Sequence, residues 1–129
     1  MNKPDLILIV EDNVGSLMLA TVLLETEGFQ VSGAESAEEA RAILASRTPD
    51  LILMDMQLPG TDGLDFTKEL KASPATAGIP VVALTARAMP ADEVAARAAG
   101  CVGFIAKPWT PESLGQEVRE FLAETRARD

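Results

Sequence analysis

Five polar side chains follow apolar segments of this 129-residue chain, each at or near the point where a segment ends. They are Glu11, Asp12, Asp55, Thr85 and Lys107. Carboxylates that are crowded together repel one another and need a cation, and oxygen ligands favour a hard ion such as Mg²⁺ where phosphate is involved. A carboxylate can also attack phosphorus, while an ammonium group and a hydroxyl group stabilise the charge of the transition state. The set therefore indicates phosphoryl-group chemistry.

Apolar segments and helical patterns alternate along the chain, and their order predicts how these side chains are brought together. Short apolar segments have the pattern of strands at residues 6–10, 30–32, 51–54, 81–84 and 102–105. Helical patterns lie between and after them, at residues 14–22, 36–46, 64–71, 90–99 and 110–122. This βαβαβαβαβα order predicts an α/β fold, a doubly wound five-stranded parallel sheet with helices on both faces. Ligands bind outside the carboxyl ends of the strands in such sheets, so we expect the polar residues at one edge.

Local signals mark the ends of several helices. Ser36 and Glu39, three residues apart, have the pattern of a capping box. Gly100 suits a left-handed C-cap after the fourth helix. Thr110 is expected to be the N-cap of the last helix, with Pro111 as its first residue.

Composition fits one globular domain, because 47% of the residues are apolar. We expect a single domain over residues 1–124, a polar tail at 125–129 and no output domain. The net charge of -9 disfavours binding to nucleic acid or to anionic membranes. Cys101 is the only cysteine, so no internal disulfide can form, and the run at 6–10 is too short for a signal peptide. A cytoplasmic location is therefore expected.

Four blocks of the sequence together resemble the signature of bacterial two-component response-regulator receiver domains, of the single-domain, CheY-like or DivK-like kind. The blocks are Ile9–Asn13, Leu53–Gly60, Ala83–Ala86 and Phe104–Pro108. The resemblance extends from the first strand to the last helix. It implies a flavodoxin-like strand order, 2-1-3-4-5.

The resemblance also implies a role for each residue of the polar set. Asp55 would accept a phosphoryl group from a phosphohistidine of a sensor histidine kinase or a histidine phosphotransfer protein. Asp12 and Asp55 would bind Mg²⁺ directly, Gln57 would add its backbone carbonyl, and Glu11 would act through water. Lys107 would pair with the phosphoryl oxygens as a point charge.

The same resemblance implies a switch. The hydroxyl group of Thr85 would turn toward the phosphoryl group, and Phe104 would rotate into the space that Thr85 leaves. Phenylalanine has no hydroxyl group, so only packing could change at this position, and an ordinary core role for Phe104 remains an alternative. The downstream target protein would bind the face formed by the fourth helix, the fifth strand and the fifth helix.

A docking surface for the histidine-bearing partner is implied at Asn13, Leu17, Pro108 and Trp109. Lys107 and Pro108 resemble a cis peptide of the family. Trp109 is either a binding hot spot or a ring packed over the base of the last helix. The resemblance further implies that Gln57 and Arg87 flank the path of the water that hydrolyses the phosphoryl group. It does not say whether they lengthen or shorten the lifetime of that group.

Three other interpretations remain open. The chain could be a receiver domain excised from a hybrid histidine kinase, although Met1 and the polar end favour a complete protein. It could be an aspartyl-phosphate phosphohydrolase similar to the haloacid dehalogenase group, but Gln57 stands where such enzymes have an acid. It could be a flavin or nucleotide binder, but no glycine-rich loop follows the first strand. We expect a phosphoacceptor that assists only its own phosphorylation and dephosphorylation, and otherwise no enzyme.

Overall fold

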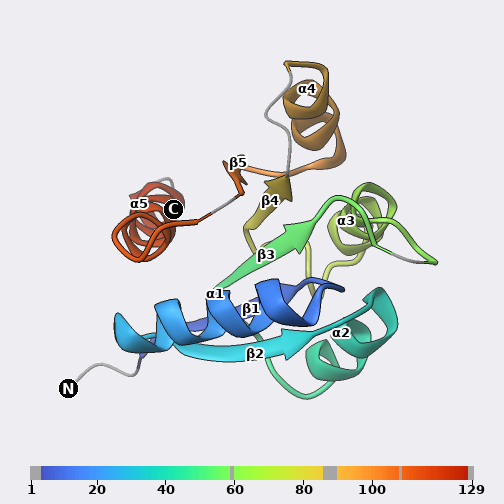
Figure 1. Ribbon diagram of the computed structural model, residues 1–129. Coiled ribbons are helices and arrows are strands. Elements are labelled where there is room, and N and C mark those ends of the chain that lie inside the picture. Colours follow the sequence, from blue (N-terminus) through green and yellow to red (C-terminus); the bar gives the residue numbers. More distant parts are fainter. Residues whose placement is uncertain (1–3, 59, 86–89, 108, 128–129) are drawn as a thin grey trace.

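Strands and helices alternate throughout the part of the chain that the structure, a computed structural model, describes (Figure 1). The structure describes residues 4–58, 60–85, 90–107 and 109–127. The strands are β1 (Leu6–Val10), β2 (Gln30–Ala34), β3 (Leu51–Asp55), β4 (Val81–Thr85) and β5 (Gly103–Ala106). The helices are α1 (Val14–Thr26), α2 (Ala37–Leu44), α3 (Gly63–Ala72), α4 (Pro90–Ala99) and α5 (Leu114–Ala127).

The strands form one parallel sheet in the order β2-β1-β3-β4-β5. The predicted fold class and strand order are therefore confirmed. The order reverses between β1 and β3, and Val10 is in register with Met54 at the carboxyl ends of these two strands. This reversal is the point at which α/β sheets of this kind bind ligands.

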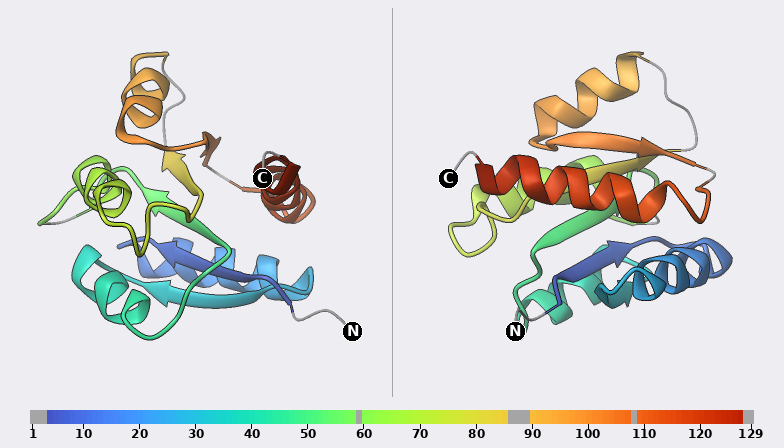
Figure 2. Two further views of the ribbon diagram at one scale, coloured as in Figure 1. Left: turned by 180° about the vertical axis from the view of Figure 1, so that it is seen from behind. Right: turned by 90° about the vertical axis from the view of Figure 1, so that its left-hand side faces the viewer.

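Helices cover both faces of the sheet, and every residue of β1 and β3 is buried (Figure 2). Burial on both faces explains why these strands have continuous apolar sequences rather than alternating ones. One face packs against α1 and α5 through residues that include Ile7, Leu53, Leu24 and Val118. The other face packs against α2, α3 and α4 through residues that include Leu8, Met54, Ala40, Phe66 and Ala96. No helix in the described ranges is long and apolar enough to cross a membrane.

The ends of α5 differ from the sequence expectation. The regular helix begins at Leu114, and residues 111–113 form a turn before it. The Oγ1 atom of Thr110 accepts a hydrogen bond from the Ser113 N–H at 3.2 Å, so Thr110 caps this turn rather than starting the helix. At its other end α5 continues to Ala127, beyond the expected boundary at 124. Arg126 is held there by the carboxylate of Asp5.

The capping box of α2 also forms differently from the predicted pattern. The Oγ atom of Ser36 accepts a hydrogen bond from the Glu39 N–H at 3.2 Å, as predicted. The carboxylate of Glu39, however, accepts from the N–H of Glu35 at 2.9 Å. The same two side chains thus accept hydrogen bonds from backbone N–H groups at the start of α2. Glu39 accepts from the N–H of Glu35 rather than from that of Ser36.

Gly63 allows the start of α3 to approach the end of β3 closely. A Cβ atom at this position would lie 2.0 Å from the backbone oxygen of Asp55 and 2.8 Å from the Cα atom of Met56. The Gly63 N–H donates to the backbone oxygen of Met56 at 3.3 Å. A glycine is therefore required where the helix closes over the segment after Asp55.

We expect Gly63→Ala to destabilise the protein, because the added methyl group must displace backbone rather than a flexible side chain. The loss should be about 2–3 kcal/mol, in the range found for overpacked cores. Urea denaturation followed by circular dichroism would measure it. Gly78→Ala is the matched control, since a Cβ at Gly78 meets no atom within 4 Å. Equal stability of the two variants would contradict this packing role.

Candidate functional site

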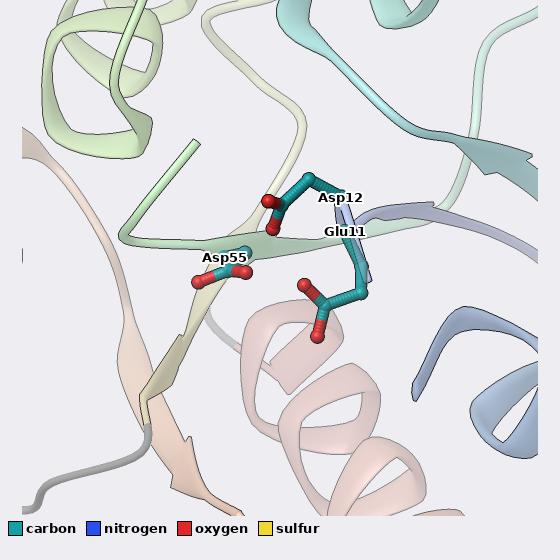
Figure 3. Close-up of side chains that lie close together, drawn as sticks. All are labelled: Glu11, Asp12 and Asp55. Atoms are coloured by element: carbon teal, nitrogen blue, oxygen red, sulfur yellow. The ribbon is translucent and has the colours of Figure 1, made fainter. Parts of the chain in front are cut away.

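Three carboxylates meet beyond the carboxyl ends of β1 and β3 (Figure 3). Glu11 and Asp12 follow β1, and Asp55 is the last residue of β3. Each offers one oxygen atom, and these oxygen atoms all lie within 4.8 Å of one another. Glu11 is fully buried and Asp55 is 7% exposed, whereas Asp12 is exposed to solvent. The sequence prediction that the three acids meet at one edge is correct.

Backbone hydrogen bonds fix the positions from which these carboxylates extend. The Glu11 N–H donates to the backbone oxygen of Ala34 at 2.9 Å, which continues the pairing of β1 with β2 by one residue. The Met56 N–H donates to the backbone oxygen of Leu84 at 3.2 Å, which does the same for β3 and β4. Glu11 and Asp55 therefore lie on backbone that is hydrogen-bonded to a neighbouring strand or directly precedes such a bond, whereas Asp12 lies in the bend that follows β1.

Lys107 brings a positive charge to this group of acids. Its backbone N–H donates to the Thr85 oxygen at 2.8 Å, so the pairing of β4 with β5 places it at the same edge. Its ammonium group makes a very short contact with the carboxylate of Glu11 and lies 3.6 Å from Oδ2 of Asp55. It also lies 5.7 Å from the centroid of the Trp109 ring. One ammonium group is thus shared by two carboxylates and one aromatic face.

Burial and the neighbouring carboxylate make Glu11 difficult to ionise. Burial, followed by the interaction with the Asp55 carboxyl group, raises the pKa of Glu11 to about 7, and Lys107 opposes part of this rise. Near neutral pH this carboxyl group is therefore balanced between its two protonation states. A cation placed beside it would favour the ionised state.

The carboxylate of Asp55 has a defined orientation. Its Oδ1 atom accepts a hydrogen bond from the Gln57 N–H at 3.0 Å, and its Oδ2 atom is the one nearest Lys107. The Gln57 side chain is exposed. The proposed metal ligand at this residue, its backbone carbonyl, remains a prediction.

A cavity of about 610 Å³ opens over the acids and receives side chains from several elements. Its wall includes all five residues of the polar set, Glu11, Asp12, Asp55, Thr85 and Lys107. Thr85 is partly buried, and the start of α1 contributes Asn13 and Ser16. The oxygen-only donor set formed by the acids fits a hard divalent cation such as Mg²⁺.

The structure shows where the two predicted switch residues, Thr85 and Phe104, lie. Phe104 is partly buried, pairs in register with Ala83 of β4, and packs on the core that faces α2, α3 and α4. Its rotation remains a prediction. Arg87 and Pro108, which the sequence analysis also singled out, lie outside the described residues.

The predicted docking surface requires a correction. Trp109 is only 8% exposed and packs in the core beneath α1 and α5, so it is a core residue rather than a contact residue. Its indole N–H has no hydrogen-bond partner among the described residues. Leu17 is partly buried, and its Cδ1 atom would lie 3.1 Å from a Cβ atom on Gly33. Asn13 is exposed, and its side chain caps α1 through the Ser16 N–H at 2.9 Å.

Sequence reasoning missed two features near the cavity. The first is an exposed apolar stripe on α1, formed by Val14, Met18, Leu19 and Val22. Three of these residues repeat every fourth position, and that spacing was the signal for a shared helical face. The second is Asp92 of α4, which lines the cavity. Nothing in the local sequence distinguishes it from other acids on helix surfaces.

Comparisons with known proteins support the interpretation of the site. Residues 7–119 match the family model of the response regulator receiver domain. The polar-differentiation response regulator DivK of Brucella anthropi is 37% identical over 121 residues, covering 94% of this chain and 98% of DivK. The phosphate regulon regulatory protein PhoB of Pseudomonas aeruginosa is 34% identical over 95% of this chain, which spans only 54% of PhoB.

A solved structure of the same fold contains a metal ion. The receiver domain of sensor histidine kinase PA1611 from Pseudomonas aeruginosa superposes with a TM-score of 0.84 at 29% identity. The match covers 93% of this chain and 98% of that one. That crystal structure has a magnesium ion coordinated in its active-site cleft.

We expect the stability of the protein in magnesium-free buffer to fall as pH rises from about 5 to about 8. The folded state keeps the Glu11 proton up to pH about 7, whereas the unfolded chain releases it near the ordinary glutamate pKa of 4.5. Stability from this group is therefore complete below the unfolded pKa and is lost as pH passes the folded one. The total loss should be up to about 3 kcal/mol.

Urea denaturation across this pH range would measure the effect. Glu11→Gln should flatten the pH dependence, while Glu112→Gln, which removes an exposed acid, should leave it unchanged. A Glu11→Gln variant with the full pH dependence would show that another group is responsible.

Proposed function

Because this chain belongs to the response regulator receiver domain family, we propose that it accepts a phosphoryl group on Asp55 from a phosphohistidine of a partner protein. The family acts in two-component signalling, and the donor would be a histidine kinase or a histidine phosphotransfer protein. One observation carries the proposal. Asp55 shares a cavity with Asp12, Thr85 and Lys107, which together supply a nucleophile and groups that stabilise a phosphoryl transition state.

In the proposed step an oxygen atom of Asp55 attacks the phosphorus atom of the phosphohistidine. A P–O bond forms and the P–N bond breaks, so its electron pair returns to the imidazole nitrogen, which takes a proton from solvent. The Gln57 N–H holds the attacking carboxylate in one orientation. Lys107, already 3.6 Å from that carboxylate, exchanges its contact with Glu11 for one with the phosphoryl oxygens.

Asp12 and Asp55 would hold Mg²⁺ directly, with the Gln57 carbonyl and, through water, Glu11. The ion, when bound, supplies positive charge that offsets the carboxylates and the oxygens of the transferred group. The short contact between Glu11 and Lys107 supports an indirect role for Glu11, since its carboxylate already has a cationic partner.

The chain would act as a signalling phosphoacceptor and not as a phosphohydrolase with other substrates. Gln57 occupies the position, two residues after Asp55, at which such a hydrolase would need an acid. An amide side chain cannot donate and recover a proton in that role. We therefore assign to this chain only its own phosphorylation and dephosphorylation.

The signal would pass from Thr85 to the surface of α4, β5 and α5, where a downstream target protein binds. Thr85 lines the cavity at the end of β4, and Phe104 lies on the adjacent strand. A hydroxyl group drawn toward the phosphoryl oxygens would leave space beside the partly buried Phe104 ring. Phosphorylation would shift the balance between two existing conformations of this surface and would not create a new conformation.

The exposed stripe of α1 offers a docking surface for the phosphodonor. It comprises Val14, Met18, Leu19 and Val22, and each side chain is 47–63% exposed. The stripe begins next to Asn13 and Ser16, which line the cavity. An apolar patch of this kind suits a helix that carries a phosphohistidine, because docking there would place the phosphoryl group at the cavity mouth.

Asp55→Asn should abolish phosphate uptake, because an amide is a poor nucleophile toward phosphorus. The test is incubation with acetyl phosphate and Mg²⁺, followed by intact-protein mass spectrometry for a single added phosphoryl group. Asp62→Asn is the matched control, since asparagine can still cap α3 in place of Asp62. Uptake by Asp55→Asn at the normal rate would refute the assignment of the acceptor.

Met18→Glu should slow phosphoryl transfer from a phosphorylated histidine partner at least tenfold and leave the reaction with acetyl phosphate unchanged. A charge in the centre of the stripe opposes apolar docking but lies outside the chemistry. Val94→Glu is the control, because Val94 is 68% exposed on α4. Phosphoryl-transfer assays from a panel of phosphorylated kinases, run in parallel with the acetyl phosphate reaction, would measure the two rates. Loss of both reactions would indicate a structural defect instead.

A further inference from the structure

Asp92 of α4 lines the same cavity as the acid cluster. It lies in the first turn of α4, and it lines the cavity together with Ala95, one turn later on the same helix. The cavity wall therefore has a fourth carboxylate, separate from the three that meet at the ends of β1 and β3. Lys107 is the only cationic side chain among the described residues that line this cavity.

The charge of Asp92 is not offset within the described part of the chain. Lys107 is occupied by Glu11 and Asp55, and Asp92 forms no ion pair with a described residue. The next residue, Glu93, differs in this respect, because its carboxylate pairs with Arg97 at 3.3 Å and does not line the cavity. Two neighbouring acids of one helix turn thus have different electrostatic roles.

We propose that Asp92 is a specificity-determining residue that opposes the entry of small phosphorylated anions and favours a protein phosphodonor. The proposal rests on the function proposed above for Asp55. A free donor such as acetyl phosphate enters the cavity as an anion with little other binding energy. Its encounter with Asp55 must take place against the field of a carboxylate that has no ion-pair partner among the described residues.

A protein donor meets the same repulsion but also gains free energy from docking on the protein surface. Asp92 therefore penalises both donors and leaves only the protein donor with a compensating contact. Specificity of this kind comes from a repulsive element against the wrong partner and needs no further attractive contact with the right one. The repulsion therefore slows the reaction of the small anion more than the reaction of the protein donor.

The size of the effect is limited by solvent. The cavity is open to water and Asp92 is exposed, so the interaction is screened. We expect a change of about two- to tenfold in rate at low ionic strength. The difference should vanish near 1 M salt, where the screening length is about 3 Å.

The first test compares rates of phosphorylation by acetyl phosphate at saturating Mg²⁺. Asp92→Asn should react two- to tenfold faster than the native protein at low salt, and the two rates should converge at high salt. Glu93→Gln is the control, because it removes the same charge from the same helix turn. Any effect on the helix dipole is shared by the two variants.

The second test measures Mg²⁺ affinity by calorimetry without any phosphodonor. Asp92→Asn should weaken Mg²⁺ binding, because the lost charge attracts cations as it repels anions. The two measurements thus move in opposite directions, which a variant with a damaged cavity would not produce. Damage would weaken Mg²⁺ binding and slow phosphorylation together.

The outcomes separate this inference from the function on which it rests. If the native protein takes up phosphate and Asp92→Asn matches it in rate at every salt concentration, the inference is wrong. An equal acceleration in Glu93→Gln would also overturn it, since a general charge effect would then suffice. If the native protein takes up no phosphate, the proposed function fails, and the Mg²⁺ titration still decides whether Asp92 contributes to the field of the cavity.

Discussion

The pairing of β1 with β3 places like charges together, and the rest of the site follows from this constraint. The two strands are neighbours in register, so the acids that follow β1 lie beside the acid that ends β3. Both faces of these strands are covered by helices, and only their carboxyl ends open to the cavity. The repulsion between Glu11 and Asp55 must therefore be balanced at that end. Lys107 supplies the balance from β5, through a strand pairing that is independent of the first.

Much of this arrangement could be predicted from sequence, because chain order determines it. Polar residues that end buried runs are easy to recognise, and a parallel sheet brings those ends to one edge. The surroundings of α1 and Trp109 could not be predicted in the same way. Apolar residues surround α1 on several sides, so periodicity alone does not select the face that Ala20 and Leu24 bury. Trp109 belongs to a core that also contains residues of α1, a helix distant from it in sequence, and a lone ring carries no signal of its exposure.

Asp92 was missed for a related reason. Its role depends on where α4 stands over the sheet, and acids in the first turn of a helix are common for reasons of helix stability alone. The sequence placed the start of α5 too early, because a proline after a threonine is as compatible with a turn as with the first residue of a helix. The residues at 111–113 form that turn, and the regular helix begins only where Leu114 enters the core.

The anchoring of α4 differs from that of α3. Its buried residues are Ala96 and Ala99, whereas α3 buries Phe66 and Leu70. Alanine side chains bury little apolar area, so they contribute less free energy to holding a helix in place. A helix held by such small contacts is easily shifted by a change of charge in the neighbouring cavity. This contrast favours α4 over α3 as the helix that would carry the proposed response away from Asp55.

The ion pair between Asp5 and Arg126 joins the two ends of the described chain at the edge of the sheet opposite the cavity. The guanidinium Nη1 atom lies 3.3 Å from the carboxylate of Asp5, and Asp50 lies 3.8 Å from the same group. Chain ends this close can be connected by a short linker. New ends could then be opened between Pro74 and Ala75, which are exposed in the turn after α3. Such a circular permutant would keep every strand pairing of the sheet, although β4 and β5 would be synthesised before β1. It would therefore show whether the geometry of the site depends on the order in which the strands are synthesised.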